Sequence, residues 1–233
     1  MRPDRHTELL MAQIIEQRDA ILSRRSLLGR GALLGAATGA VALGLAPALR
    51  GTAMAQDDAT PSDAGSDDNG GFDDDVAVLN YALTLEHLES AFYRDNAQTY
   101  DLGADGFGNS INDYMAIIAE HEAAHVETLT SVITDLGGEP VEEATYDFGV
   151  TDAASFLATA AALENTGVSA YDGAAQYIED VGLLNAAGTI VAVEARHASY
   201  LNLVTGELPF PSSFETPLTM DEVLEIAGPF ITG

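Results

Sequence analysis

The chain has 233 residues, and its 37 acidic residues against nine basic ones, all arginine, give a formal net charge of −28. A surface this acidic repels the phosphates of nucleic acid and of anionic lipid, which argues against a nucleic-acid-binding protein and against attachment to an acidic membrane surface. Cysteine is absent, so the composition excludes disulfides and lipid attachment at a cysteine.

The first 55 residues have the pattern of an export signal. A polar stretch, residues 1–22, is followed by Arg24 and Arg25 within Ser-Arg-Arg-Ser-Leu-Leu, and then by an uncharged run rich in Gly, Ala and Leu. This resembles a twin-arginine signal, which is read in bacteria as an export address. We expect cleavage after Ala55, with a retained membrane anchor as the alternative.

The rest of the chain is even more acidic. Only four of the 37 acidic residues precede residue 56, so 33 lie in residues 56–233, where Arg94 and Arg196 are the only basic side chains. Such an imbalance is typical of proteins that work in high salt, where a short Debye length screens their self-repulsion. We therefore expect a halophilic protein, and an ordinary acidic exported protein is the alternative.

Residues 56–72 are rich in Asp, Gly and Ser, which predicts a disordered acidic linker. The folded domain is expected over residues 73–233. In it, the spacing of apolar residues and the Gly and Pro boundaries predict four long helices, at about 73–98, 112–136, 152–178 and 183–204. A short fifth helix is expected from Thr219, which forms a capping box with Glu222, to Pro229.

The connection between the second and third helices, Gly137 to Thr151, is long. Fully extended, it would reach roughly 50 Å, whereas the helix before it is about 38 Å long. The connection can therefore cross the whole bundle. We expect such a crossover, and a loose hairpin is the alternative.

Two Glu-x-x-His pairs lie on predicted helices, and each is preceded along the chain by a helix that offers one more Glu. Residues three apart on a helix lie about 60° from each other, so each pair presents a carboxylate and an imidazole to one point. Two such helices, with two others that give one Glu each, can build a dinuclear metal site inside a four-helix bundle. The candidate ligands are Glu86, Glu122, His125, Glu164, Glu194 and His197.

An internal repeat supports this ligand set. Aligning Glu86 with Glu164 also pairs Tyr93 with Tyr171, each seven residues after its Glu and about 20° from it on the helix. A Glu-x-x-His pair then follows in each copy. The domain thus reads as two copies of one helical hairpin.

The sequence around these residues resembles the ferritin-like superfamily, and most of all its exported branch, which includes desiccation-related proteins. The matching segments are residues 80–93, 121–125, 193–197 and 209–211. The resemblance implies an all-α, ferritin-like four-helix bundle with a crossover between helices 2 and 3 and a short C-terminal helix. It does not fix one reaction, because that superfamily includes iron stores, oxidases, peroxidases and manganese catalases.

The charge of the ligands indicates what they could hold. Four carboxylates balance two divalent cations, with both imidazoles as neutral donors, and mixed Glu and His ligation suits two Fe or Mn ions, while Zn also accepts these ligands. We expect Glu122 and Glu194 each to serve the metal of its own His partner. Glu86 and Glu164 would then complete or bridge the two ions, and which residues bridge stays open.

Other residues are candidates for contacts behind the ligands. Tyr93 and Tyr171 are expected either to bind the ligand carboxylates or to fill the core, and His121 either to support the site or to pack elsewhere. No catalytic residue is assigned. Glu89 is expected to be exposed or hydrogen-bonded, with an additional ligand as the alternative.

The leading hypothesis is an exported dimetal redox protein that acts on dioxygen, superoxide or hydrogen peroxide. The first alternative is a metal-bound stress or desiccation-related structural protein without turnover, and the second is iron storage. The expected partners are metal ions and a small-molecule oxidant, without nucleic acid and without stable membrane insertion once the signal is removed. A homo-oligomer is left open, and the expected location is extracellular, cell-surface or periplasmic.

Overall fold

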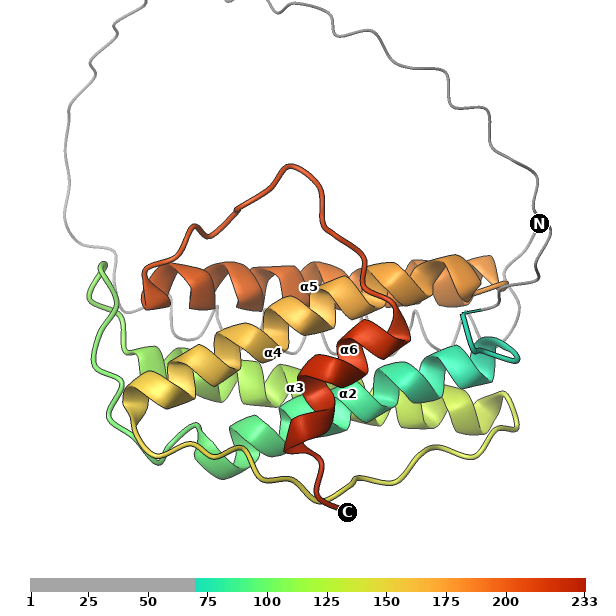
Figure 1. Ribbon diagram of the computed structural model, residues 1–233, viewed down its shortest axis with the longest axis horizontal. Helices are drawn as coiled ribbons and strands as arrows, with labels where there is room; N and C mark the ends of the chain where they lie inside the picture. Colours follow the sequence, from blue (N-terminus) through green and yellow to red (C-terminus); the bar gives the residue numbers. More distant parts are fainter. Residues whose placement is uncertain (1–69) are drawn as a thin grey trace, which may run out of the picture.

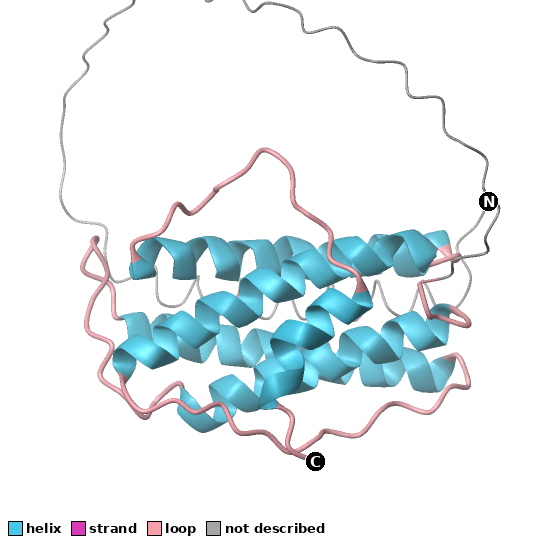
Figure 2. Ribbon diagram, viewed as in Figure 1, coloured by secondary structure: helices cyan, strands magenta, loops and turns pink. Residues whose placement is uncertain are grey.

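The computed structural model describes residues 70–233, and the regular structure in this part of the chain is helical (Figure 2). The predicted signal and most of the predicted linker lie outside the described residues. No helix within residues 70–233 is long and apolar enough to cross a membrane. The predicted all-α architecture is confirmed, with α2 (Asp75–Asn96), α3 (Ile111–Asp135), α4 (Ala153–Ala174), α5 (Val181–Thr205) and α6 (Met220–Ala227), and with 3-10 turns η2 (Ala175–Tyr177) and η3 (Gly228–Phe230).

Acidic and hydroxyl side chains set the helix N-termini. The carboxylate of Asp74 accepts from the Ala77 amide at 2.8 Å ahead of α2, and Asp152 forms a capping box with Ser155 ahead of α4. Such side chains satisfy amides that have no partner within the helix, and their negative charge is favourable near a helix N-terminus. The predicted capping box at Thr219 is also present, at the start of α6.

The four long helices form two antiparallel hairpins, α2 with α3 and α4 with α5. The connection between them, residues 136–152, runs along the whole length of the bundle (Figure 1). The predicted crossover is therefore confirmed. The side chain of Asn80 on α2 holds this crossover. Its Nδ2 donates to the Glu139 carbonyl at 3.1 Å, and its Oδ1 accepts from the backbone amide of Val141 at 2.7 Å.

The last residues of the chain also hold the crossover. The Thr145 amide donates to the Gly233 carbonyl at 2.8 Å, and the Thr232 amide donates to the Thr145 carbonyl at the same distance. Tyr146 and Ile231 form an isolated antiparallel bridge next to these hydrogen bonds. The segment after α6 thus fixes the strap that joins the two hairpins.

The core of the bundle has two unlike halves. One half is aromatic, with Phe92 stacked on Phe156 at a ring-centroid distance of 5.1 Å and Tyr93 packed beside them. The other half is aliphatic and includes Leu83 and Ile190. The candidate ligands lie between these two halves.

The N-terminal boundary of the packed region differs from the expected one. Phe72, which the sequence places at the end of the linker, is only 6% exposed, and its ring lies 5.4 Å from that of Tyr81 and 5.5 Å from that of Tyr177. A single buried aromatic can anchor a polar segment, and this explains why composition alone set the boundary too late.

Gly173 on α4 allows the segment before α6 to approach closely. A Cβ at this position would overlap the backbone carbonyl of Leu218, whose amide donates to the Ser169 carbonyl at 3.0 Å. The glycine is therefore required by packing, although it weakens the helix itself.

We predict that Gly173→Ala lowers the free energy of unfolding by about 1–3 kcal/mol, because backbone must move to make room. Gly188→Ala is the matched control, since a Cβ there meets nothing within 4 Å. That change should stabilise α5 by up to about 1 kcal/mol. Denaturant unfolding in high salt measures both variants, and an equal effect of the two would contradict the packing argument.

Candidate metal centre

The structure brings the six predicted ligand residues together in the middle of the bundle. They form two overlapping groups, and within each group one ligand atom per residue lies within 4.8 Å of the others. The groups are Glu86, Glu122, His125 and Glu194, and Glu122, Glu164, Glu194 and His197. Each of the four long helices contributes, as the two-hairpin pattern predicts.

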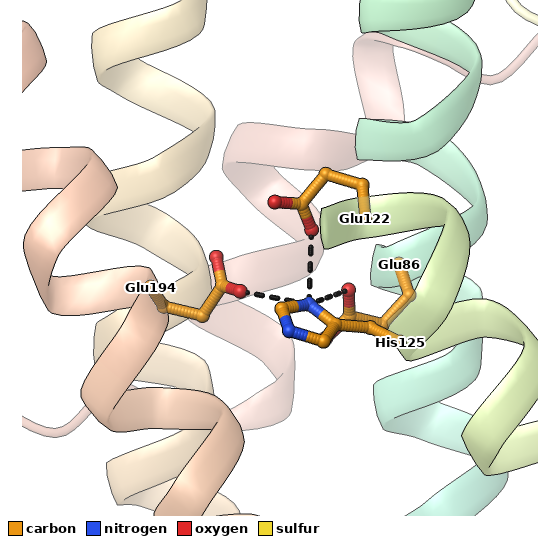
Figure 3. A group of neighbouring side chains, drawn as sticks. All are labelled: Glu86, Glu122, His125 and Glu194. Carbon is orange, nitrogen blue, oxygen red and sulfur yellow. Dashed lines mark hydrogen bonds and ion pairs between the residues drawn. The ribbon is translucent and has the colours of Figure 1, made fainter. Parts of the chain in front are cut away.

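In the first group the imidazole of His125 points at three carboxylates, one from each of three helices (Figure 3). Its Nδ1 atom lies 3.2 Å from Glu86 Oε2, 3.2 Å from Glu122 Oε2 and 3.0 Å from Glu194 Oε1. All three carboxylates are fully buried. One ring nitrogen and three carboxylate oxygens therefore lie close enough together to coordinate a single cation.

The second group repeats this arrangement around His197. Its Nδ1 lies 3.1 Å from Glu122 Oε1, 3.1 Å from Glu164 Oε2 and 3.8 Å from Glu194 Oε2. Glu122 and Glu194 thus direct one oxygen to each group, whereas Glu86 and Glu164 each belong to one. This differs from our expectation that Glu122 and Glu194 each serve one metal, because helix spacing cannot predict how a carboxylate turns between two neighbours.

The two tyrosines bind the carboxylates that belong to one group each. The Tyr93 hydroxyl on α2 donates to Glu164 Oε1 on α4 at 2.6 Å, and the Tyr171 hydroxyl on α4 donates to Glu86 Oε1 on α2 at 2.5 Å. Of the two alternatives left open for these residues, the structure shows carboxylate contact. Each bond fixes the orientation of a carboxylate and ties one hairpin to the other.

His121 supports only one of the two groups. Its Nδ1 lies 2.8 Å from His197 Nε2, and the two rings are nearly parallel. Burial first, and then the neighbouring His197 and His125, lower the pKa of His121 to about 4, so His121 is neutral at pH 7. The repeat places Val193 at the matching position on α5, so His125 has no such support from that helix.

Glu89 is the residue whose environment the sequence analysis missed. It is only 2% exposed, so the expected exposed position is wrong. Burial first, and then the neighbouring carboxylates of Glu194 and Glu164, raise the pKa of Glu89 well above its usual value. A Cβ on Gly167 would lie 3.0 Å from Glu89 Oε1, so the glycine makes room for this carboxylate. The repeat aligns Glu89 with Gly167. This pairing of a large side chain with a glycine is the sequence signal from which the burial of Glu89 could have been predicted.

Burial and neighbouring charges divide the carboxylates into two kinds. Burial raises the pKa of Glu86 to about 8 and raises that of Glu164 well above its usual value, although His125 and His197 oppose it. Burial acts on Glu194 in the same direction, but the close approach of both imidazoles outweighs burial and lowers the pKa of this carboxyl. The imidazoles are held protonated in return, since the carboxylates raise the pKa of both well above the usual value.

The buried carboxylate oxygens of the two groups suit divalent cations better than they suit the N–H groups that the two imidazoles can offer. Glu122 Oε1 and both oxygens of Glu194 are buried without a well-aligned hydrogen bond, although imidazole nitrogens lie within ion-pair distance of each. A single Nδ1–H cannot point at three oxygens at once, so these buried oxygens stay poorly paired. Two divalent cations would satisfy these oxygens and balance four carboxylate charges.

The shared position of Glu122 makes a testable distinction. We predict that Glu122→Gln loses both ions, because this carboxylate faces both groups, whereas Glu86→Gln keeps about one ion per chain, because Glu86 faces one. Elemental mass spectrometry of the purified variants measures the content. Equal losses in the two variants would show that the carboxylates are not shared in this way.

Metal loading should also depend on pH. Below about pH 8 the Glu86 carboxyl keeps a proton, and the neighbouring carboxylates raise the pKa of both imidazoles, so a cation must displace protons to bind. Affinity should therefore rise with pH between about 6 and 8, because binding releases protons and their concentration in solution falls. Competition against a chelator, corrected for the chelator's own protonation, measures the effect, and a flat profile would refute it.

A family model described as a ferritin-like domain matches residues 74–207. No curated protein matches the chain. Among solved structures, the chain is similar to a conserved hypothetical protein from Mycobacterium tuberculosis, with 22% sequence identity and a TM-score of 0.48, over 59% of this chain and 94% of that one. A likeness at this level carries no argument about function.

Proposed function

This chain belongs to the ferritin-like domain family, and on that premise we propose that it holds two Fe or Mn ions and uses them for redox chemistry on dioxygen or reactive oxygen species. The observation that supports the proposal is the pair of overlapping carboxylate and imidazole groups buried between the four long helices. A site with four buried carboxylates would be costly to keep without cations. When bound, such ions would supply one-electron redox changes and Lewis acidity.

The residues around the groups would give this chemistry a defined setting. The Tyr93 and Tyr171 hydroxyls donate hydrogen bonds to Glu164 and Glu86, each from the opposite hairpin. The bond between His121 and His197 fixes the tautomer of His197, because its Nε2 keeps a proton when Nδ1 faces the ions. Burial of all four carboxylates excludes bulk water from the centre.

A metal-bound structural or desiccation-related protein without turnover is the second candidate. The observation that favours it is the closure of the site, because Glu86, Glu122, Glu164 and Glu194 are all 0% exposed. A structural metal site is closed, while turnover needs an open coordination position. Iron storage would require assembly into a shell of many subunits.

We further propose that the protein works outside the cytoplasm and in high salt. The twin-arginine pattern before residue 56 supports export, and a route that carries folded proteins suits a chain that takes up its metal before export. The absence of lysine and the net charge of −28 support a salt-rich setting, where repulsion between surface carboxylates is screened.

The decisive experiment measures metal and turnover on one sample. The protein is recovered from outside the cells in high salt, without chelator or added metal, where its chain should begin at Gln56. About two Fe or Mn ions per chain, with turnover of dioxygen, superoxide or peroxide, are expected for the redox protein. The same ions without turnover would favour the structural candidate. No metal after attempted reconstitution would refute both.

A further inference from the structure

A cavity of about 30 Å³ lies in the aliphatic half of the bundle, at the end where α4 leads into α5. All four long helices contribute to its wall. It is lined by side chains that are aliphatic except for Tyr81 and Tyr171.

The cavity lies next to the candidate metal centre. Ala82, Leu129 and Ile190 line it, and they lie four residues, about 6 Å along the helix axis, from Glu86, His125 and Glu194 respectively. Tyr171 also lines it, and the hydroxyl of that residue donates to Glu86 at 2.5 Å. The cavity and the first ligand group thus share a wall.

Water is a poor occupant of this space. A buried water needs two to four polar partners, whereas the Tyr171 hydroxyl already binds Glu86. The Tyr81 hydroxyl is buried and has no partner within the described residues, so it could satisfy one bond at most. A cavity with such a lining stays dry and takes small apolar molecules.

The internal repeat relates the two halves of the bundle, and the cavity is present in only one of these halves within the described residues. Where this half has Val78, Ala170 and Ala187, the aromatic half has Phe92, Phe156 and Met115, all fully buried. The positions correspond as Val78 with Phe156, Ala170 with Phe92 and Ala187 with Met115. In the aromatic half, larger side chains fill the space that the smaller side chains of the aliphatic half leave empty.

We propose that this cavity binds dioxygen and holds it beside the Glu86, Glu122, His125 and Glu194 group. The proposal rests on the redox function proposed above and selects one substrate from its range. Superoxide is an anion, which the acidic chain repels and an apolar lining disfavours. Hydrogen peroxide would lose hydrogen bonds to water that the lining cannot replace. Dioxygen is uncharged and loses little on leaving water.

The test uses the paramagnetism of dioxygen on the Zn²⁺-loaded protein, in which the metal itself is diamagnetic. Dissolved dioxygen should speed the relaxation of the Leu129 and Ile190 methyl resonances more than that of the exposed Leu203 methyls. Xenon at moderate pressure should shift the same buried methyl resonances. Zinc content measured on the same sample separates failure of the metal site from failure of the cavity.

Cavity-filling variants make the assignment specific. Ala187→Met inserts the residue that the other hairpin has at this position, and the selective dioxygen and xenon effects should be lost while zinc content is kept. Val78→Phe is a second filling variant if the first does not fold. Ala192→Met, on the exposed side of α5, is the control and should behave as the parent. Equal effects in the parent and in a folded filling variant would overturn the proposal.

Discussion

The cost of burying carboxylates governs this structure. Four glutamates from four helices are fully buried within one cluster, and a fifth, Glu89, lies close by with 2% exposure. Each would lose several kcal/mol of hydration if it stayed charged without a partner. Two tyrosine hydroxyls donate hydrogen bonds to these carboxylates, and two imidazoles lie beside them. The arrangement of the carboxylate oxygens suits divalent cations.

The placement of acidic side chains on the surface is also governed by electrostatics. Aspartates begin α2, α4 and α5, where they accept from helix amides and where negative charge is favourable. The apolar side chains of the bundle therefore have to supply the cohesion that opposes repulsion among the surface carboxylates. The aromatic half contributes the stacked rings of Phe92 and Phe156, while the aliphatic half contains the cavity.

Several features could be predicted from sequence because they depend on local periodicity. The four long helices, the short α6 and the convergence of the six candidate ligands all follow from spacing along single helices and from one internal repeat. The sharing of Glu122 and Glu194 between groups could not be predicted, because it depends on side-chain torsions set by contacts between helices. The burial of Glu89 depends on a missing Cβ at Gly167 on another helix.

The crossed bonds between Tyr93 and Glu164 and between Tyr171 and Glu86 have a consequence for how such a chain could arise. Each hairpin supplies the phenol that the other hairpin's carboxylate needs, so neither hairpin carries a complete set. Reciprocal contacts of this kind are the pattern of a two-fold symmetric dimer. The bundle is thus arranged as a dimer of hairpins on one chain, and the strap over residues 136–152 is the covalent link between the two copies. With both copies on one chain, equivalent positions were free to differ, so that large side chains fill one end of the bundle and smaller ones leave a cavity at the other.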